Sequence, residues 1–238
     1  MKNFLTSFGR HLLDFAYPDI CVACENRITD TRSAICFECQ WDLPRNTNLL
    51  IHNESQENKF WGKVKTSGIY SFLRFTKGGK VQNILHALKY QNRPELGIFL
   101  GKLCGKALKD QHLFLHADYL VPVPLHRARL RERGYNQAGC LATGISEILE
   151  IPVRHDLLAR NKSTLTQTRS GGRLSRYRNL EGVFEATETA PEVLRDKAVI
   201  LVDDVLTTGA TLEVAATALW KTGIRELFIV TLAAVNRS

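Results

Sequence analysis

The sequence predicts an α/β protein in which a doubly wound, mostly parallel sheet of about five strands is flanked by helices and preceded by a small cysteine-containing module. Residues 199–202 form a short apolar, largely β-branched run that leads through a tight turn into a helical pattern over residues 212–220. A second apolar run, residues 119–124, leads into a basic segment and then a helix-like stretch. Four cysteines near the N-terminus form two CxxC pairs. Strands that alternate with helices in this way are typical of a parallel sheet covered on both faces.

The composition is that of a folded protein with a surplus of positive charge. The chain has 238 residues, 44% of them hydrophobic, which is enough for one main domain with a real core and a small appendage. Lysine and arginine number 32 against 24 acidic residues, giving a net charge of +8. This charge favours an anionic partner, either a polyphosphate or a nucleic acid, although solubility alone also explains it.

The N-terminal stretch Met1–Phe15 is not expected to be a signal peptide. Arg10 and Asp14 interrupt its apolar run, and no small-residue cleavage site follows. Its apolar residues fall near one helical face, which predicts a helix docked onto the neighbouring module; contact with a membrane surface is the alternative. No stretch approaches transmembrane length, and we expect a cytoplasmic protein.

The two cysteine pairs, separated by eleven residues, predict a structural zinc site. Each pair can present two thiolates from a tight knuckle, and two knuckles complete a tetrahedral set of four sulfur ligands. The candidate ligands are Cys21, Cys24, Cys36 and Cys39. The alternatives are disulfides and a dithiol redox site. A reducing compartment disfavours disulfides, and a redox site would use one CxxC pair and leave the other unexplained. Cys104 and Cys140 lie in apolar helical runs and are expected to be inert core residues.

The composition divides the chain into three parts. Residues 1–45 hold the N-terminal helix and the cysteine module, residues 46–66 form a polar, aperiodic linker, and residues 67–238 form the main domain. The first predicted elements of the main domain are an edge or hairpin strand and two helices, at residues 68–75, 81–90 and 94–108.

An arginine-rich segment, residues 125–138, comes directly after the strand at 119–124. Ligands of open α/β sheets bind beyond the carboxyl ends of the strands, where this segment begins. Its arginines can hold pyrophosphate oxygens through paired hydrogen bonds and stay charged at any working pH. A solvated helix start or a nucleic-acid patch are the alternatives.

A second arginine-rich segment, residues 165–179, lies between two strands predicted near 153–158 and 182–184. It contains Gly171 and Gly172, which permit hinge-like backbone conformations. Such a loop can close over a reactive phosphate and exclude water. A plain exposed loop or an arginine-rich contact to nucleic acid fits the same residues.

An acidic pair, Asp203 and Asp204, follows the apolar run at 199–202 and precedes a hydroxyl-rich turn, Thr207–Thr211. A turn at a helix N-terminus offers free N–H groups and the positive end of the helix dipole to a phosphate. The carboxylates would repel that phosphate and instead accept hydrogen bonds from a sugar diol, or face a magnesium-bound side of the ligand. The implied ligand is a ribose 5-phosphate; the alternative is an ordinary crossover with two solvated aspartates.

The stretch Leu201–Thr211 resembles the phosphoribosyl-pyrophosphate (PRPP) loop of the type I phosphoribosyltransferases, in its hydrophobic run, acidic pair, Thr-Thr-Gly and second hydroxyl. The cysteine module, the stretch His126–Gln137, the segment Gln167–Asn179 and this loop occur together in this order. In that combination the chain is similar to the ComF family (ComFC-like or amidophosphoribosyltransferase-like proteins) over nearly its whole length. The resemblance implies a type I phosphoribosyltransferase-like fold with an N-terminal zinc knuckle, structural Zn²⁺, and Mg²⁺ bound with PRPP.

The resemblance also implies roles for single residues. Asp203 and Asp204 would be catalytic, because they fix the ribose and stabilise its developing positive charge. The 5-phosphate and ribose of PRPP would bind to Asp203, Asp204, Val205, Leu206, Thr207, Thr208, Gly209, Ala210 and Thr211. Pyrophosphate would bind to Arg133, Gly134, Tyr135 and Asn136. A flexible loop over the site would carry Arg169, Arg173 and Arg176.

Two main functions and a weaker third one are compatible with the sequence. The first is a transferase of nucleoside metabolism that moves the 5-phosphoribosyl group from PRPP to an unidentified acceptor and releases pyrophosphate. The second is a binding module in competence and DNA uptake, which the family resemblance implies, with PRPP or a nucleotide in the pocket and single-stranded DNA or a DNA-uptake protein as partner. A purine or pyrimidine salvage enzyme is a third, weaker hypothesis, because no base-reading segment is evident. His126 is a general base only in principle.

Overall fold

The computed structural model describes residues 19–28, 33–46, 60, 64–160 and 182–235. The predicted N-terminal helix, most of the predicted linker and the predicted flexible loop with its three arginines lie outside these residues. The predicted boundaries at residues 45 and 66 stay predictions.

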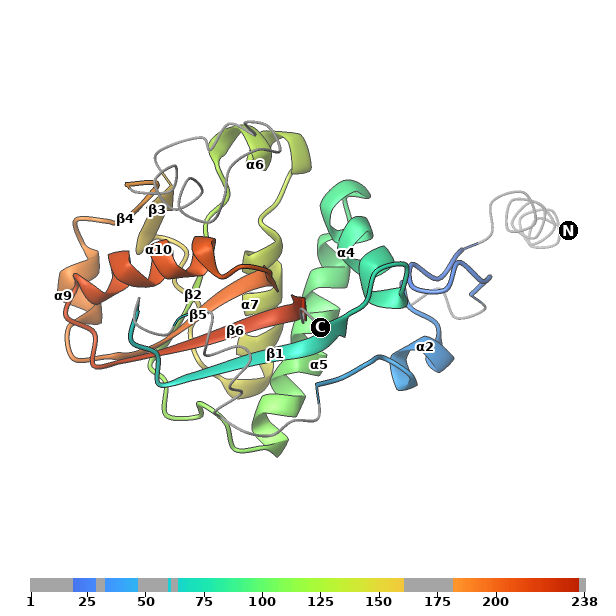
Figure 1. Ribbon diagram of the computed structural model, residues 1–238, viewed down its shortest axis with the longest axis horizontal. Helices are drawn as coiled ribbons and strands as arrows, with labels where there is room; N and C mark the ends of the chain where they lie inside the picture. Colours follow the sequence, from blue (N-terminus) through green and yellow to red (C-terminus); the bar gives the residue numbers. More distant parts are fainter. Residues whose placement is uncertain (1–18, 29–32, 47–59, 61–63, 161–181, 236–238) are drawn as a thin grey trace, which may run out of the picture.

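Within the residues that the structure describes, the main sheet has four strands, all parallel, in the order β1-β6-β5-β2 (Figure 1). Their bounds are Gly68–Phe75 for β1, Glu226–Val235 for β6, Ala198–Leu206 for β5 and Tyr119–Pro122 for β2. A single parallel bridge from Leu120 to Val153 extends the sheet beyond β2. Strand β1 is an edge strand, one of the two predicted options, and it pairs in parallel with β6 rather than in a hairpin.

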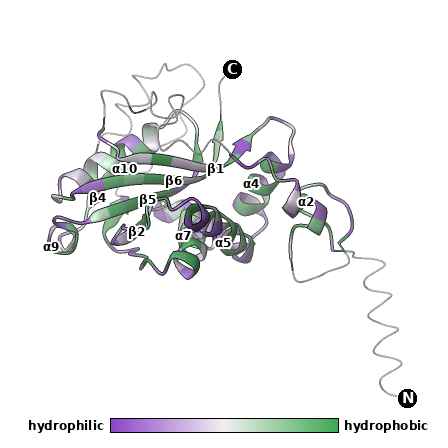
Figure 2. Cartoon of the chain, turned by 90° about the horizontal axis from the view of Figure 1, so that it is seen from below, coloured by the Kyte–Doolittle hydropathy of each residue, from purple (hydrophilic) through white to green (hydrophobic). Residues whose placement is uncertain are grey.

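Both faces of the sheet are covered, as a doubly wound fold requires. On β5, Ile200 and Val202 face one hydrophobic cluster, whereas Val199 and Leu201 face a second one. Helices α4 (Lys80–Tyr90), α5 (Pro94–Asp110) and α7 (Gln137–Leu149) lie on one side of the sheet. Helix α10 (Ala210–Trp220) lies on the other side (Figure 2). The predicted α/β class and doubly wound parallel sheet are confirmed.

Helices α5 and α7 approach each other closely because glycines face each other at their crossing. A Cβ atom added at Gly144 would collide with the carbonyl oxygen of Ile98 and come within 2.8 Å of the Gly101 Cα atom. Any side chain at this point would therefore force the two helices apart.

In the described residues, the two strands predicted near residues 153–158 and 182–184 do not form strands of the main sheet, which Val153 joins through the single bridge to Leu120. Strands β3 (Leu158–Arg160) and β4 (Phe184–Ala186) pair antiparallel in a sheet of their own. Helix α9 (Ala190–Leu194) follows β4, and all three elements share the hydrophobic cluster of α10. The pattern of short apolar runs predicted strands at this point, but it carried no information on which strand pairs with which.

In its described residues the cysteine module contains the short helix α2 (Phe37–Trp41), and it belongs to the same hydrophobic cluster as α4 and α5. The segment after α2 pairs with the outer edge of β1: the Asn46 N–H donates to the Phe72 carbonyl and the Arg74 N–H to the Pro44 carbonyl, each at 2.8 Å. This pairing covers an edge that would otherwise expose unpaired backbone groups. In the described part of the chain, no helix combines the length and the apolar character that crossing a bilayer requires.

Candidate functional site

A cavity of about 290 Å³ opens at the carboxyl edge of the main sheet. Segments far apart in the sequence surround it: the last turn of α4, the loop after β2 with helix α6 (Arg127–Arg133), the start of α7, the end of β3, and β5 with the turn that follows. Its polar lining comprises Lys89, Arg129, Arg133, Asn136, Gln137, Arg160, Asp203, Asp204, Thr207 and Thr211. Cationic side chains thus face two carboxylates across one opening.

The acid pair lies inside β5, because the strand continues to Leu206 instead of ending at Val202 as the sequence predicted. The long neighbour β6 causes this extension, since it pairs Asp203 with Thr231 and Val205 with Ala233. The backbone that carries the two carboxylates is therefore held by the sheet and is not part of a free turn.

The two carboxylates differ in their surroundings. Burial, and then the charge of Asp204, raise the pKa of Asp203 to about 8. The Asp204 N–H donates to Asp203 Oδ1 at 2.8 Å and opposes this rise without cancelling it. The Oδ2 atom of Asp204 lies 2.8 Å from Lys89 Nζ. The pair thus combines a carboxyl that favours its proton with a carboxylate that holds a cation.

The residues predicted to bind pyrophosphate fall into two groups. Arg133 and Asn136 line the cavity, whereas Gly134 and Tyr135 are not among its lining residues. Gly134 ends α6 with a φ of 78°, and the Tyr135 hydroxyl donates to the carbonyl oxygen of Leu88 at 2.5 Å. Whether this segment binds pyrophosphate stays a prediction.

Asn136 and Arg133, which line the cavity, each have a buried polar atom without a hydrogen-bond partner in the described residues. Asn136 donates through Nδ2 to the Val123 carbonyl at 3.0 Å, so its Oδ1 is the atom left over. The Nε of Arg133 is likewise buried and unpaired. Buried donors and acceptors are nearly always satisfied, by water or by ligand atoms if not by protein.

The predicted phosphate turn leads into the N-terminus of α10. Gly209 caps this helix with a φ of 82°, a conformation that favours glycine. The side chains of Thr207 and Thr211 line the cavity together with Val205. The Leu206 side chain is fully buried in the core, so only its backbone could meet a ligand. The first N–H groups of α10 have no acceptor within the helix, which suits an anion.

Sequence reasoning missed three cationic residues of the site as candidates: Lys89, Arg129 and Arg160. Burial, and then the charge of Arg129, lower the pKa of Arg160, and its guanidinium lies 5.2 Å from the centre of the Phe184 ring. Arg129 belongs to the segment that was singled out, and Arg160 follows a predicted strand, so both carried a weak signal. Nothing in the sequence indicated that Lys89 belongs to the site, because it lies at what the pattern predicts to be an ordinary helix end.

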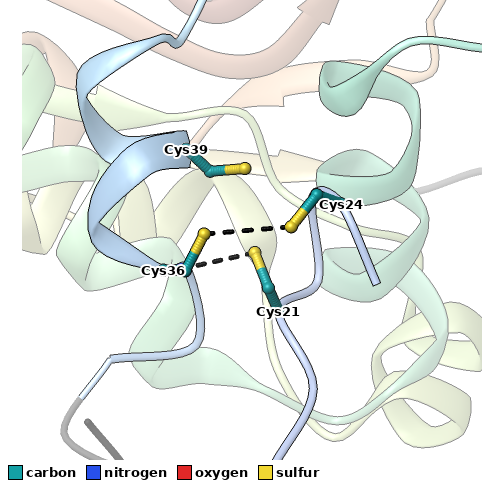
Figure 3. A group of neighbouring side chains, drawn as sticks. All are labelled: Cys21, Cys24, Cys36 and Cys39. Atoms are coloured by element: carbon teal, nitrogen blue, oxygen red, sulfur yellow. Dashed lines mark hydrogen bonds between the residues drawn. The ribbon is translucent and has the colours of Figure 1, made fainter. Parts of the chain in front are cut away.

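The four N-terminal cysteines lie together in a second site (Figure 3). None of them lines the cavity. Their sulfur atoms all lie within 4.8 Å of one another, and the Sγ atoms of Cys24 and Cys36 are 3.8 Å apart. A tetrahedral zinc site with Zn–S bonds of about 2.3 Å separates its sulfurs by roughly 3.8 Å. The donor set therefore fits a zinc knuckle, and the cluster can bind a metal ion.

Hydrogen bonding within the cluster favours the thiolate form of Cys21. The Cys36 N–H points to Cys21 Sγ at 3.3 Å. Burial works against ionisation of Cys21, but backbone N–H groups, that of Cys36 foremost, outweigh it and lower its pKa to about 7. The thiol of Cys39 has its pKa raised by burial and by the neighbouring sulfurs. Four thiolates this close need a cation between them.

Comparisons with known proteins agree with this architecture. Residues 136–238 match the family described as "Phosphoribosyl transferase domain". The chain is 29% identical to Competence protein F of Haemophilus influenzae over 228 residues, covering 94% of each chain. It is 28% identical to the DNA utilization protein YhgH of Escherichia coli, covering 86% of this chain and 85% of that one. It is 27% identical to Competence protein ComFC of Bacillus subtilis, covering 86% of this chain and 79% of that one.

Proposed function

Since the chain belongs to the ComF family within the type I phosphoribosyltransferase superfamily, we propose that it binds PRPP with magnesium and transfers the 5-phosphoribosyl group to an acceptor with release of pyrophosphate. The observation that carries the proposal is the cavity itself, in which an acid pair on β5 faces four cationic side chains. A sugar that bears both neutral hydroxyls and a polyphosphate matches this division of charge.

In the proposed complex, each part of PRPP contacts protein groups of complementary charge or hydrogen-bonding capacity. The diol of the ribose would donate to Asp203 and Asp204, and the 5-phosphate would accept from the backbone of the turn at Gly209. Arg129 and Arg133 would neutralise the pyrophosphate. Carboxylate oxygens are the ligand type that Mg²⁺ prefers, so Asp203 and Asp204 would hold the ion, and it would supply positive charge that stabilises the leaving group.

The chemistry would depend on the charges that develop when the anomeric C–O bond breaks. The ribose ring becomes positively charged. A ring whose diol is bound to Asp203 and Asp204 would be stabilised by the negative charge of this acid pair. The leaving pyrophosphate becomes more negative, and the positive charges of Arg129 and Arg133 would stabilise it. Apart from the acid pair, the described residues that line this cavity include no carboxylate or histidine that could act as a general base.

Calorimetric titration of PRPP with magnesium tests the proposal. The wild-type protein should bind, and the double variant Asp203→Asn/Asp204→Asn should lose at least about 2 kcal/mol of binding free energy, because hydrogen bonds to charged groups are worth this much. Asp196→Asn is the matched control, since Asp196 is exposed and lies just before the first residue of β5, at the opposite end of that strand. Equal binding by wild type and the double variant would overturn the ribose assignment.

A second candidate function is an accessory role in DNA uptake without turnover, with PRPP or a nucleotide in the cavity and single-stranded DNA as partner. The names of the relatives, competence proteins and DNA utilization proteins, favour it. On α2 of the cysteine module, Phe37 and Trp41 are 77% and 83% exposed and one helical turn apart, as bases that stack on aromatic rings would require. Release of pyrophosphate with an amine or nucleobase present supports the transferase; affinity for single-stranded DNA that falls steeply with salt, without such release, supports the accessory role.

We also propose that the cysteine cluster holds one structural zinc ion. The sulfur geometry supports this, since the spacing of Cys24 and Cys36 is that of neighbouring ligands in a tetrahedral zinc site. Metal analysis of the purified protein should give close to one zinc per chain. A folded protein without metal would contradict the assignment.

A further inference from the structure

Lys89 and Asp204 form an ion pair inside the wall of the cavity. Lys89 is in the last turn of α4, and its Nζ lies 2.8 Å from Asp204 Oδ2 on β5. Their side chains are only 28% and 21% exposed, and both residues line the cavity. The pair is therefore neither a freely solvated surface contact nor buried away from a ligand.

Hydrogen bonds hold the end of α4 against the arginine-rich segment, residues 125–138, next to the cavity. The carbonyl oxygen of Leu88 accepts hydrogen bonds from the hydroxyl of Tyr135 and from Nε2 of Gln137. The guanidinium of Arg133 lies 5.7 Å from the centre of the Tyr90 ring. These contacts fix the backbone of Lys89, whereas its four-carbon side chain keeps the freedom to move its charge between neighbouring anions.

The ammonium group of Lys89 lies against one of the two carboxyl groups that would attract a divalent cation. Two adjacent carboxylates are hard oxygen donors and attract Mg²⁺ or Mn²⁺. A second positive charge about 4 Å from an ammonium group is repelled by about 4 kcal/mol per unit charge near a protein surface. With Lys89 on Asp204, the acid pair is thus neutralised in part and is a poor site for a metal ion alone.

We propose that Lys89 is the built-in counter-cation of the acid pair: it holds Asp204 in the ligand-free protein, keeps free divalent cations out, and moves to the pyrophosphate when a metal-bound sugar diphosphate enters. The metal ion then binds only together with a diphosphate, because the diphosphate replaces Asp204 as the partner of the Lys89 ammonium group. This makes Lys89 a specificity-determining residue that favours metal–diphosphate complexes over sugar monophosphates. The ligand class rests on the proposed function, whereas the exclusion of free cations rests on the ion pair alone.

Titration of the zinc-loaded protein with Mn²⁺ in the absence of any other ligand, followed by electron paramagnetic resonance of the free ion, tests the exclusion. Lys89→Met and Lys89→Gln should each bind Mn²⁺ at least about tenfold more tightly than the wild type, because the competing charge is gone. Lys89→Arg keeps the charge and should behave as the wild type does. Lys102→Met, which removes an exposed lysine paired with Glu147 at 2.6 Å, is the matched control and should not change Mn²⁺ binding.

Adding Asp204→Asn to Lys89→Met should abolish the gained Mn²⁺ affinity, which places the new ion on the acid pair. If neither Lys89→Met nor Lys89→Gln gains affinity for Mn²⁺, or if the gain persists with Asp204→Asn, the counter-cation role is wrong. A wild type that fails to bind PRPP overturns the proposed function and the ligand class but not the exclusion of cations. A wild type that binds PRPP while Lys89→Met gains no Mn²⁺ affinity overturns the role of Lys89 alone.

Discussion

Replacing Asp203 with asparagine should stabilise the protein at neutral pH. Burial, and then the charge of Asp204, raise the pKa of Asp203 to about 8, from 3.8 for an unperturbed carboxyl. The charged groups around it also include Lys89, which favours its ionised form, and Arg160, whose guanidinium interacts with it. The folded protein therefore keeps a proton that the unfolded chain has lost above about pH 4.

The size and sign of the effect follow from proton linkage. A carboxyl whose pKa is higher in the folded state contributes most to stability below the pKa of the unfolded chain, and this contribution is lost as the pH rises towards the folded pKa. With values of 3.8 and about 8, the penalty at about pH 7 reaches at most ~4 kcal/mol, because a tenfold change in proton binding corresponds to about 1.4 kcal/mol. Because Asp203 lines an open cavity, solvent screening reduces this penalty, and we expect Asp203→Asn to gain about 2 kcal/mol at this pH.

Urea denaturation of wild type and Asp203→Asn from about pH 4 to about pH 8 measures the effect. The difference in unfolding free energy should be close to zero at the acid end and should grow with pH. Asp118→Asn is a control of opposite sign: the Ala198 N–H, and then Lys197, lower the pKa of Asp118, so this variant should lose stability at neutral pH. If Asp203→Asn proves as stable as, or less stable than, the wild type across the range, the carboxyl is not destabilised by its surroundings and the reasoning fails.

Two further substitutions test the helix crossing and the cysteine cluster. Gly144→Ala should cost about 2–3 kcal/mol in urea denaturation, because its methyl group would collide with the Ile98 carbonyl. Gly139→Ala on the same helix should cost much less, since its methyl group would lie 3.3 Å from a movable histidine ring; equal losses would show that the close crossing is not the cause. Cys24→Ser and Cys36→Ser should each release the proposed zinc and unfold the module, as seen by metal analysis and limited proteolysis. A serine variant that keeps a full equivalent of zinc would rule that cysteine out as a ligand.

The amino-acid sequence by itself determined the local features of this protein. The run at residues 199–202 forms a buried strand because apolar residues on both of its faces can be buried only between two layers of helices. The acid pair and the glycine turn lead into α10 as predicted, since strand, turn and helix N-terminus follow one another within a few residues. The cysteine cluster was also predicted, because its two CxxC pairs lie close together in the chain.

The tertiary structure alone decided which distant residues complete the cavity. Lys89 reaches Asp204 because α4 ends beside β5, and no periodicity in the chain encodes that neighbour. Arg160 belongs to the cavity because β3 pairs with β4 away from the main sheet, and Tyr135 turns to the end of α4 instead of the ligand side. A local pattern reports which residues are buried and how the backbone bonds nearby, whereas the lining of a cavity depends on how whole elements pack, and that is fixed only when the chain is folded.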